Sequence, residues 1–219
     1  MKRMFLIGVA LAAVLSACAQ NPVASPTAIT NPTAVATAPP LTRAKGVQQL
    51  AMDARGKNLY KAASDGLFVS GDEGKTWNKV ALPNEIADKP ISQIALRTET
   101  PDTIFIAGEE IGVWRSRDAG ASWKQVNNEI ASGRVTALTL HSNGYPRDES
   151  KGLYVWVDRV GVFESHDDGD SWKQSADTKI GLSNQDVTAL THTALEGSMN
   201  TGWLYAATAS GAYLSMDCF

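Results

Sequence analysis

The sequence predicts an all-β fold, a β-propeller of four-stranded blades, with about four blades present and the last one incomplete. An octet of the pattern S-x-D-x-G-x-[S/T]-W recurs at 70–77, 116–123 and 165–172, at offsets of 46 and 49 residues. Three short runs rich in Val, Ile, Tyr, Trp and Thr precede each copy, as expected of strands. Four short strands in a repeat of this length are typical of a propeller blade.

The strands are predicted in the same order in every repeat. The first run is VQQLAMD, ISQIALR, VTALTLH or VTALTHT, and VTALT occurs at both 135–139 and 187–191. A second run such as NLYKAAS follows, and then a run that begins with glycine, such as GLFVS from Gly66. Segments such as WKQV, at the end of the octet, supply the fourth strand. The predicted blades are about 47–81, 91–127, 135–175 and 187–219, the last one partial.

The octet has the residues of a tight corner between the third and fourth strands. Aspartate accepts hydrogen bonds from nearby backbone N–H groups, glycine takes the positive φ that side chains resist, and tryptophan covers the hairpin with a large apolar surface. The residues expected to have this structural role are Ser70, Asp72, Gly74, Trp77, Ser116, Asp118, Gly120, Trp123, Ser165, Asp167, Gly169 and Trp172, with Ser215 and Asp217 beginning a fourth copy.

The third octet contains three acids, Asp167, Asp168 and Asp170, and two roles are considered for them: metal ligands or turn residues. The position of Asp168 is Ala119 in the second octet, and a metal site would not tolerate alanine where a ligand belongs. A helix–loop–helix calcium loop also needs a bidentate Glu at its twelfth position. We interpret the three acids as turn residues and expect no metal and no cofactor. The three histidines are not spaced along the sequence as metal ligands are, so they are expected to be structural or solvated. They are His141, His166 and His192.

The octet resembles the Asp-box, also called the bacterial neuraminidase repeat, and the resemblance covers residues 47–219. Sialidases, sortilin-type receptors, xyloglucanases and photosystem II assembly factors carry this box, and all are β-propellers. The resemblance therefore implies the fold, but it does not imply an activity, because these proteins have unrelated functions. The layout is similar to that of the photosystem II assembly-factor-like and sortilin-like propellers.

Residues 1–17 have the layout of a secretory signal, with two cations before an apolar run of about 14 residues, which is too short to span a bilayer as a helix. The run ends in Leu-Ser-Ala-Cys, which resembles the lipobox of bacterial lipoproteins. The resemblance implies cleavage after Ala17 and a lipid on Cys18, the alternative being a soluble secreted protein. Ala19 after the cysteine implies the outer membrane in a two-membrane cell, and otherwise the outer face of the plasma membrane is expected.

Residues 18–45 are predicted to be a tether between the lipid and the domain at 46–219. They hold five of the nine prolines and no acid. A segment of this composition cannot recover its ordering entropy by burial. Its reach is about 30 Å as a coil and up to about 80 Å if proline keeps it extended. Such a spacer would hold the domain off a membrane while leaving it free to meet partners.

The composition and charge of the chain argue against one class of function, nucleic-acid binding. Apolar residues make up 43% of the chain and charged residues 20%, an ordinary globular balance. The formal net charge is −3, and no basic run follows residue 3. The electrostatic signature of a nucleic-acid-binding protein is therefore missing.

The candidate binding face lies away from the octets. Successive strands of a blade alternate in direction, so the turns between second and third strands share one face with the connections between blades. In Asp-box sialidases, which the octets resemble, the active site opens on this face. This face carries both charges with an excess of acids, which suits a basic or sugar ligand. The ordinary explanation for charged residues in such turns is that they are simply solvated. The candidate residues are Asp65, Glu109, Glu110, Arg134, Asp158 and Arg159.

No catalytic residue is predicted. A sialidase would carry an RIP motif, a Tyr–Glu pair and three arginines, and no RIP motif occurs. A xyloglucanase would need two carboxylates flanking a sugar bond, and the spacing of Glu110 and Asp158 does not single them out. We predict a non-catalytic lipoprotein that binds a protein or glycan partner, in a scaffold or assembly role. The alternatives are a glycoside hydrolase fragment and a non-specific surface propeller that binds polysaccharide.

The sequence ends in SMDCF, with Phe219 where the octet has glycine. This ending favours a truncated or incomplete longer propeller over a natural four-bladed form. In a closed propeller the upstream candidate for the missing strand is TAVATA at 33–38. In a fragment, we expect the open sides of the first and fourth blades to expose apolar surface and to drive pairing or aggregation.

Overall fold

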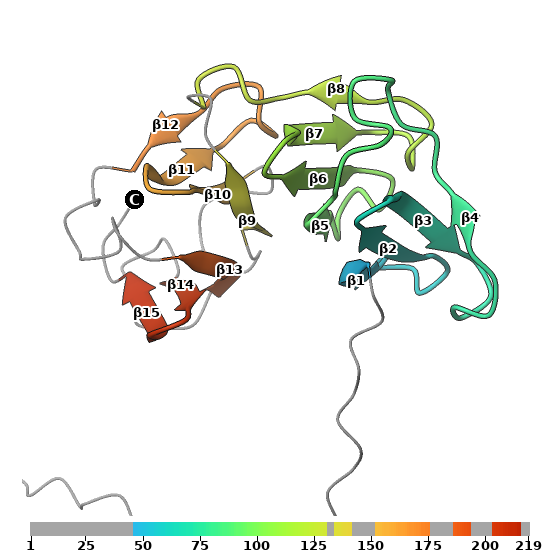
Figure 1. The fold of residues 1–219 in the computed structure, drawn as a ribbon, viewed down its shortest axis with the longest axis horizontal. Coiled ribbons are helices and arrows are strands. Elements are labelled where there is room, and N and C mark those ends of the chain that lie inside the picture. Colours follow the sequence, from blue (N-terminus) through green and yellow to red (C-terminus); the bar gives the residue numbers. More distant parts are fainter. Residues whose placement is uncertain (1–45, 131–133, 142–151, 176–185, 194–202, 216–219) are drawn as a thin grey trace, which may run out of the picture. The chain divides into compact units, whose positions relative to one another are not determined.

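The computed structural model describes residues 46–130, 134–141, 152–175, 186–193 and 203–215. Fifteen strands in these ranges form four antiparallel sheets, and the strands of each sheet follow one another in sequence order (Figure 1). The sheets are four blades of a β-propeller, which confirms the predicted fold. No helix occurs in the described ranges, so none there is long and apolar enough to cross a membrane.

The fifteen strands are divided among the four blades as follows. The first blade contains β1 (Val47–Met52), β2 (Leu59–Ala63), β3 (Gly66–Ser70) and β4 (Asn78–Lys79). The second contains β5 (Gln93–Leu96), β6 (Ile104–Gly108), β7 (Gly112–Ser116) and β8 (Lys124–Gln125). The third contains β9 (Val135–Leu140), β10 (Leu153–Val157), β11 (Gly161–Ser165) and β12 (Lys173–Gln174). The fourth contains β13 (Val187–Thr193), β14 (Trp203–Thr208) and β15 (Gly211–Ser215).

Some sequence predictions fall outside these strands. Ser215 is the last residue of β15, but Asp217 of the fourth octet lies outside the described residues. The same is true of the signal at 1–17, the lipid site Cys18 and the candidate closing strand at 33–38. The structure therefore tests none of these predictions.

The three complete octets share one hydrogen-bond geometry. In the second octet the Ser116 hydroxyl donates to Asp118 Oδ1 at 2.8 Å. Ser122 donates its backbone N–H and its hydroxyl to the same carboxylate, at 2.8 and 2.6 Å. The backbone N–H of Gly120 donates to the Ser116 hydroxyl oxygen at 2.8 Å. One carboxylate and one hydroxyl thus close the corner between the third and fourth strands.

Two consecutive residues of each octet have a positive φ, whereas the sequence predicts it for glycine alone. In the second octet φ is 95° at Gly120 and 56° at Ala119. The corresponding side chains Glu73 and Asp168 have φ of 62°. Non-glycine residues adopt this region at a cost and keep it only where the surroundings impose it. The hydrogen bonds of the octet provide those surroundings.

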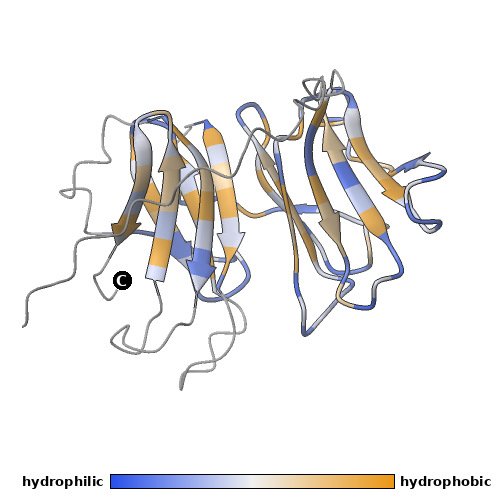
Figure 2. Cartoon of the chain, turned by 90° about the horizontal axis from the view of Figure 1, so that it is seen from below, coloured by the Kyte–Doolittle hydropathy of each residue, from blue (hydrophilic) through white to orange (hydrophobic). Residues whose placement is uncertain are grey.

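The hydrophobic core lies between consecutive blades. The innermost strand β1 lies beside β5, β5 beside β9, and β9 beside β13. Tyr60 and Leu67 of the first blade pack against Ile94 and Ile106 of the second. We call such a contact between consecutive blades a joint, and the joints between the second and third blades and between the third and fourth are built in the same way. Figure 2 shows hydrophobic residues along the strands and hydrophilic residues in many of the turns. Burial of these apolar faces holds the blades together.

Polar side chains of the inner strands also bridge neighbouring blades. Gln49 Oε1 accepts a hydrogen bond from the backbone N–H of Ile94 at 2.7 Å. Gln93 Nε2 donates to the carbonyl oxygen of Thr136 at 2.9 Å, and the Thr136 hydroxyl donates to the carbonyl oxygen of Val187 at 2.7 Å. All three joints therefore carry a side-chain-to-backbone bond near the centre of the propeller.

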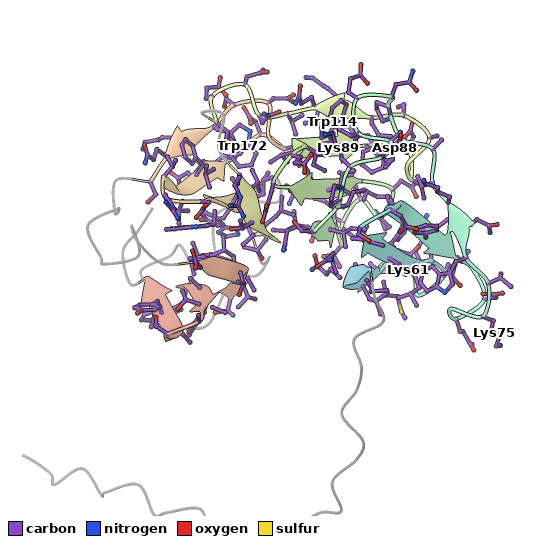
Figure 3. The ribbon with its side chains drawn as sticks, in the orientation of Figure 1. Lys61, Lys75, Asp88, Lys89, Trp114 and Trp172 are labelled. Carbon is purple, nitrogen blue, oxygen red and sulfur yellow. The ribbon has the colours of Figure 1, made fainter. Side chains whose placement is uncertain are left out.

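Two of the three octet tryptophans, Trp123 and Trp172, connect blades, which their sequence pattern alone does not predict. Trp172 lies between the second and third blades (Figure 3), and its Nε1 donates to the carbonyl oxygen of Val126 at 2.5 Å. Trp123 Nε1 donates to the carbonyl oxygen of Ala81 in the first blade at 3.2 Å. A Cβ at Gly169 would lie 3.0 Å from a methyl group of Val126. These octets therefore dock on the preceding blade as well as covering their own hairpins.

Acids of the third octet tie it to the second blade. Arg97, which follows β5, contacts Asp168 Oδ1 through Nε at 2.9 Å and through Nη2 at 2.7 Å. Arg115 Nη1 and Lys124 Nζ lie 3.2 and 2.8 Å from the Asp170 carboxylate. Hydrogen bonds from Lys124 and Arg115 lower the pKa of Asp170 to about 2. The two acids, which the sequence identifies only as turn residues, therefore form a cross-blade ion network.

Candidate binding site

A hollow of about 560 Å³ lies on the face away from the octets, where the inner strands begin. Because the turns between second and third strands reach the same face, side chains from all four blades contribute to it. The lining residues are Gln48, Ser92, Gln93, Glu109, Arg134, Thr136, Asp158, Arg159, Asp186, Val187 and Thr188. None of these side chains is aromatic, and most of them are polar or charged.

Four polar residues of the lining, called the polar floor below, come from the same position of every inner strand. The strands align as VQQL, ISQI, VTAL and VTAL, and the second residue of each lines the hollow. Hydroxyl and amide groups at this position can donate and accept hydrogen bonds. These four residues are Gln48, Ser92, Thr136 and Thr188.

Charged side chains at the hollow form ion pairs around Arg134. Its Nη2 lies 2.6 Å from Glu109 Oε1, and its Nη1 lies 3.8 Å from Asp158 Oδ2. The hydrogen bond with Glu109 raises the pKa of Arg134. Arg159 Nε lies 4.0 Å from the same oxygen of Asp158. With Asp186 the hollow has three carboxylates and two guanidinium groups, so its formal charge is negative.

The structure brings four of the six predicted binding-face residues together: Glu109, Arg134, Asp158 and Arg159. Asp65 is exposed in the β2–β3 turn and does not line the hollow. Glu110 is also outside the lining, and its Oε2 accepts a hydrogen bond from Lys89 Nζ at 2.8 Å. Glu110 and Asp158, the carboxylate pair considered for sugar hydrolysis, therefore do not meet in the hollow.

The sequence prediction missed the polar floor. Gln48, Ser92, Thr136 and Thr188 lie inside the predicted strands or at their starts, and residues there are most simply read as strand surface. Their common position in the aligned repeats is the signal that could have identified them. In a propeller, equivalent positions of the inner strands converge on one central axis, so a polar residue in all four repeats indicates a shared surface.

A second hollow, of about 640 Å³, lies where the inner strands end. Its lining is mainly aliphatic, and it also contains His141. The ring of His141 lies 4.0 Å from the ring of His192, and the ring of Tyr154 is stacked on His192 at 5.5 Å, measured between ring centres. Within the described ranges no group of three or more His, Cys, Asp or Glu side chains could hold a metal ion. The other histidine, His166, is exposed, and its Nε2 lies 3.7 Å from Glu164.

No protein-family profile matches this sequence, and no curated protein resembles it at a significant level. Similar solved structures are β-propellers. The GH74 xyloglucanase from Xanthomonas campestris has a TM-score of 0.53 at 20% identity and covers 77% of this chain and 29% of its own. The extracellular domain of a hybrid two-component system from B. thetaiotaomicron has a TM-score of 0.55 at 15% identity, with 77% and 21% covered.

A third structure, YCF48 bound to D1 peptide, has a TM-score of 0.54 at 16% identity and covers 75% of this chain and 47% of its own. This chain thus spans less than half the length of each of the three. At identities this low the similarity shows the propeller fold alone. The three proteins have different functions, so the fold does not select among them.

Proposed function

We propose that this protein is a non-catalytic β-propeller, held at the cell envelope by a lipid on Cys18, that binds a polar segment of a partner protein in the acid-leaning hollow. The observation that supports the proposal most is the lining itself. The lining combines hydroxyl and amide groups of the inner strands with three carboxylates and two arginines. Such groups suit the backbone and the charged side chains of a peptide, with preference for basic ones.

The lipoprotein character rests on the first 45 residues. A charged start, a short apolar run, Leu-Ser-Ala-Cys and a proline-rich spacer follow one another in the order of an envelope lipoprotein. We also propose that the three octets are Asp-boxes, because their residues and their shared hydrogen-bond geometry fit a repeated hairpin corner. The propeller would then be a scaffold that presents the hollow to partners in the envelope.

Synthetic peptides of graded charge test the binding site. We expect lysine- or arginine-containing peptides to bind the purified full-length chain, as measured by fluorescence anisotropy. The double variant Asp158→Asn with Asp186→Asn should weaken this binding about tenfold or more, because hydrogen bonds to charged groups contribute about 1.5–3 kcal/mol each. Asp65→Asn is the matched control, since Asp65 is on the same face but outside the hollow. Equal losses in both variants would contradict binding in the hollow.

Glycoside hydrolysis is the second candidate, because three carboxylates gather at one hollow. Such enzymes use two carboxyl groups on either side of the scissile bond. Against this reading, Arg134 pairs with both Glu109 and Asp158. Ligand sites are also commonly lined with aromatic groups, and this lining has none. Turnover of any member of an aryl-glycoside panel, abolished by Asp158→Asn, would replace the binding proposal with an enzymatic one.

A further inference from the structure

Within the described ranges, no other blade covers one face of the first blade's sheet. Four inner-strand residues occupy one position, since their partners on the second strands, Lys61, Ile106, Val155 and Ala206, are equivalent in the repeats. These four residues are Leu50, Ile94, Leu138 and Leu190. In the second, third and fourth blades this residue packs against the preceding blade and is 2%, 4% and 8% exposed. Leu50 is 54% exposed, and Met52, on the same face, is 60% exposed. The face of β1 that a preceding blade covers elsewhere is therefore open.

The first octet shows the same open position. Trp123 and Trp172 donate to carbonyl oxygens of the preceding blade. Trp77 instead lies under Lys61 (labelled in Figure 3), whose Nζ is 4.5 Å from the centre of its ring and 4.6 Å from that of Phe68. Lysine here replaces the apolar residue of the other blades and shields the two rings from water. The uncovered apolar surface is consequently concentrated at Leu50 and Met52.

No strand in the described part of the chain covers the opposite face of the fourth blade. In the first blade Tyr60, Ala62 and Leu67 are buried against the second blade. The residues with the same strand register in the fourth blade are half-buried or exposed, and Leu214 beside them is 37% exposed. This open face consists of Tyr205, Ala207, Ala212 and Leu214.

The two open faces are the two halves of the joint that this chain already makes three times. In each joint, one blade contributes the positions left open on the fourth blade, and the next contributes those left open on the first. Within the described ranges, β1 and β13 make no contact like those between consecutive inner strands. The faces of one copy therefore do not cover each other.

We propose that a second copy of this chain covers both faces. The fourth blade of one copy packs on the first blade of the other, and two such head-to-tail joints related by a two-fold axis close a ring of eight blades. Propellers of four to eight blades are known, so a ring of this size is sterically reasonable. Head-to-tail contacts form a closed ring when the rotation closes and an open filament when it does not. This inference is independent of the proposed binding function.

The third joint indicates which residues should meet. There Tyr154 stacks on His192 at 5.5 Å between ring centres. By register, Tyr205 has the position of Tyr154, and Met52 has that of His192. A cysteine at 205 in one copy should therefore lie within reach of a cysteine at 52 in the other copy.

Cross-linking of two differently tagged full-length chains tests the proposal. Both chains carry Cys18→Ser and Cys218→Ser, which removes the two native cysteines. One chain also carries Tyr205→Cys and the other Met52→Cys, and a short bismaleimide is added after co-expression. We expect a band of twice the chain mass that contains both tags, and its loss when either chain is used alone. Lys75→Cys, in the exposed turn of the first octet (Figure 3), replaces Met52→Cys as the control and should give no band.

Two outcomes would overturn the proposal. The first is no cross-link between the two chains, although a monofunctional maleimide labels both cysteines. The second comes from one chain carrying both cysteines: a closed ring gives cross-linked pairs only, whereas a ladder of larger species would show an open filament. Leu50→Glu replaces an exposed side chain, so it should leave the far-ultraviolet circular dichroism spectrum unchanged while abolishing the double-mass band.

Discussion

A single carboxylate sets the conformation of each octet. Hydrogen bonds from the Ser122 hydroxyl, the Ser122 backbone N–H and the Ser116 hydroxyl lower the pKa of Asp118 to about 2. Hydrogen bonds from Thr76 and Ser70 do the same for Asp72. Because these bonds favour the ionised form, the acid is stabilised as an acceptor at the hairpin corner. This is the arrangement of a structural turn residue.

Replacement of Asp118 by alanine should lower the urea midpoint of unfolding. The variant leaves Ser116 and Ser122 without their shared acceptor and removes support from the positive φ of Ala119. Asp118→Asn retains one acceptor oxygen and should lose less. Equilibrium urea unfolding of the three proteins provides the comparison. If the alanine variant unfolds at the midpoint of the unchanged chain, the octet acid is not a structural element.

The hairpin with the octet also acts as a joint between blades. Residues at the same position behave differently according to whether a blade precedes them. Glu73, in the first octet, is exposed, and its carboxylate lies 3.4 Å from Lys75. Asp168, in the third octet, is buried beside Arg97 of the second blade. The same hairpin conformation therefore serves as a surface turn in one blade and as a cross-blade anchor in another.

Asp168→Ala should destabilise the protein by about 3–5 kcal/mol, because it leaves the buried guanidinium of Arg97 without its partner. Glu73→Ala at the equivalent exposed position should change stability by no more than about 0.5 kcal/mol. Chemical denaturation of both variants measures the difference. Similar values for the two would show that the ion pair between the second and third blades contributes nothing to stability.

The octet acids make the stability of the propeller sensitive to acid. The pKa values of Asp72 and Asp118 are about 2, as is that of Asp170, and that of Asp167 is also lowered. For Asp167, burial opposes ionisation, but hydrogen bonds from Ser171 and Ser165 outweigh it. A folded-state pKa below the unfolded value means that the folded chain binds fewer protons in acid. The stabilisation is therefore fully present above the unfolded value and is lost as pH falls through the folded one.

The melting temperature should thus be steady at neutral pH and fall steeply between about pH 4 and pH 2, where unfolded aspartates protonate first. Calorimetric scans across this range measure it. Asp118→Asn should flatten the curve, because one of the titrating groups is gone. A main loss of stability near pH 6 would contradict this prediction.

The fold and the four-residue charged cluster at the hollow could be predicted from the repeats, because alternation of strand direction is a local rule that assigns each turn to a face. The polar floor could not, because Gln48 and Thr188 belong to strands 140 residues apart and meet only through the convergence of the blades. For the same reason the predicted role of Trp172 was incomplete. Its pattern indicates an apolar cover, but its hydrogen-bond partner Val126 lies 46 positions away.

The sequence by itself determined the strands, the blade period and the hairpin corners, because alternation, glycine placement and short-range hydrogen bonding act within a few residues. Only the tertiary structure decided which acids are surface turns and which anchor a neighbouring blade, and which side chains share the hollow. These outcomes depend on contacts such as that between Arg97 and Asp168, 71 positions apart. Packing of one blade on the next creates such contacts, and no local pattern encodes them.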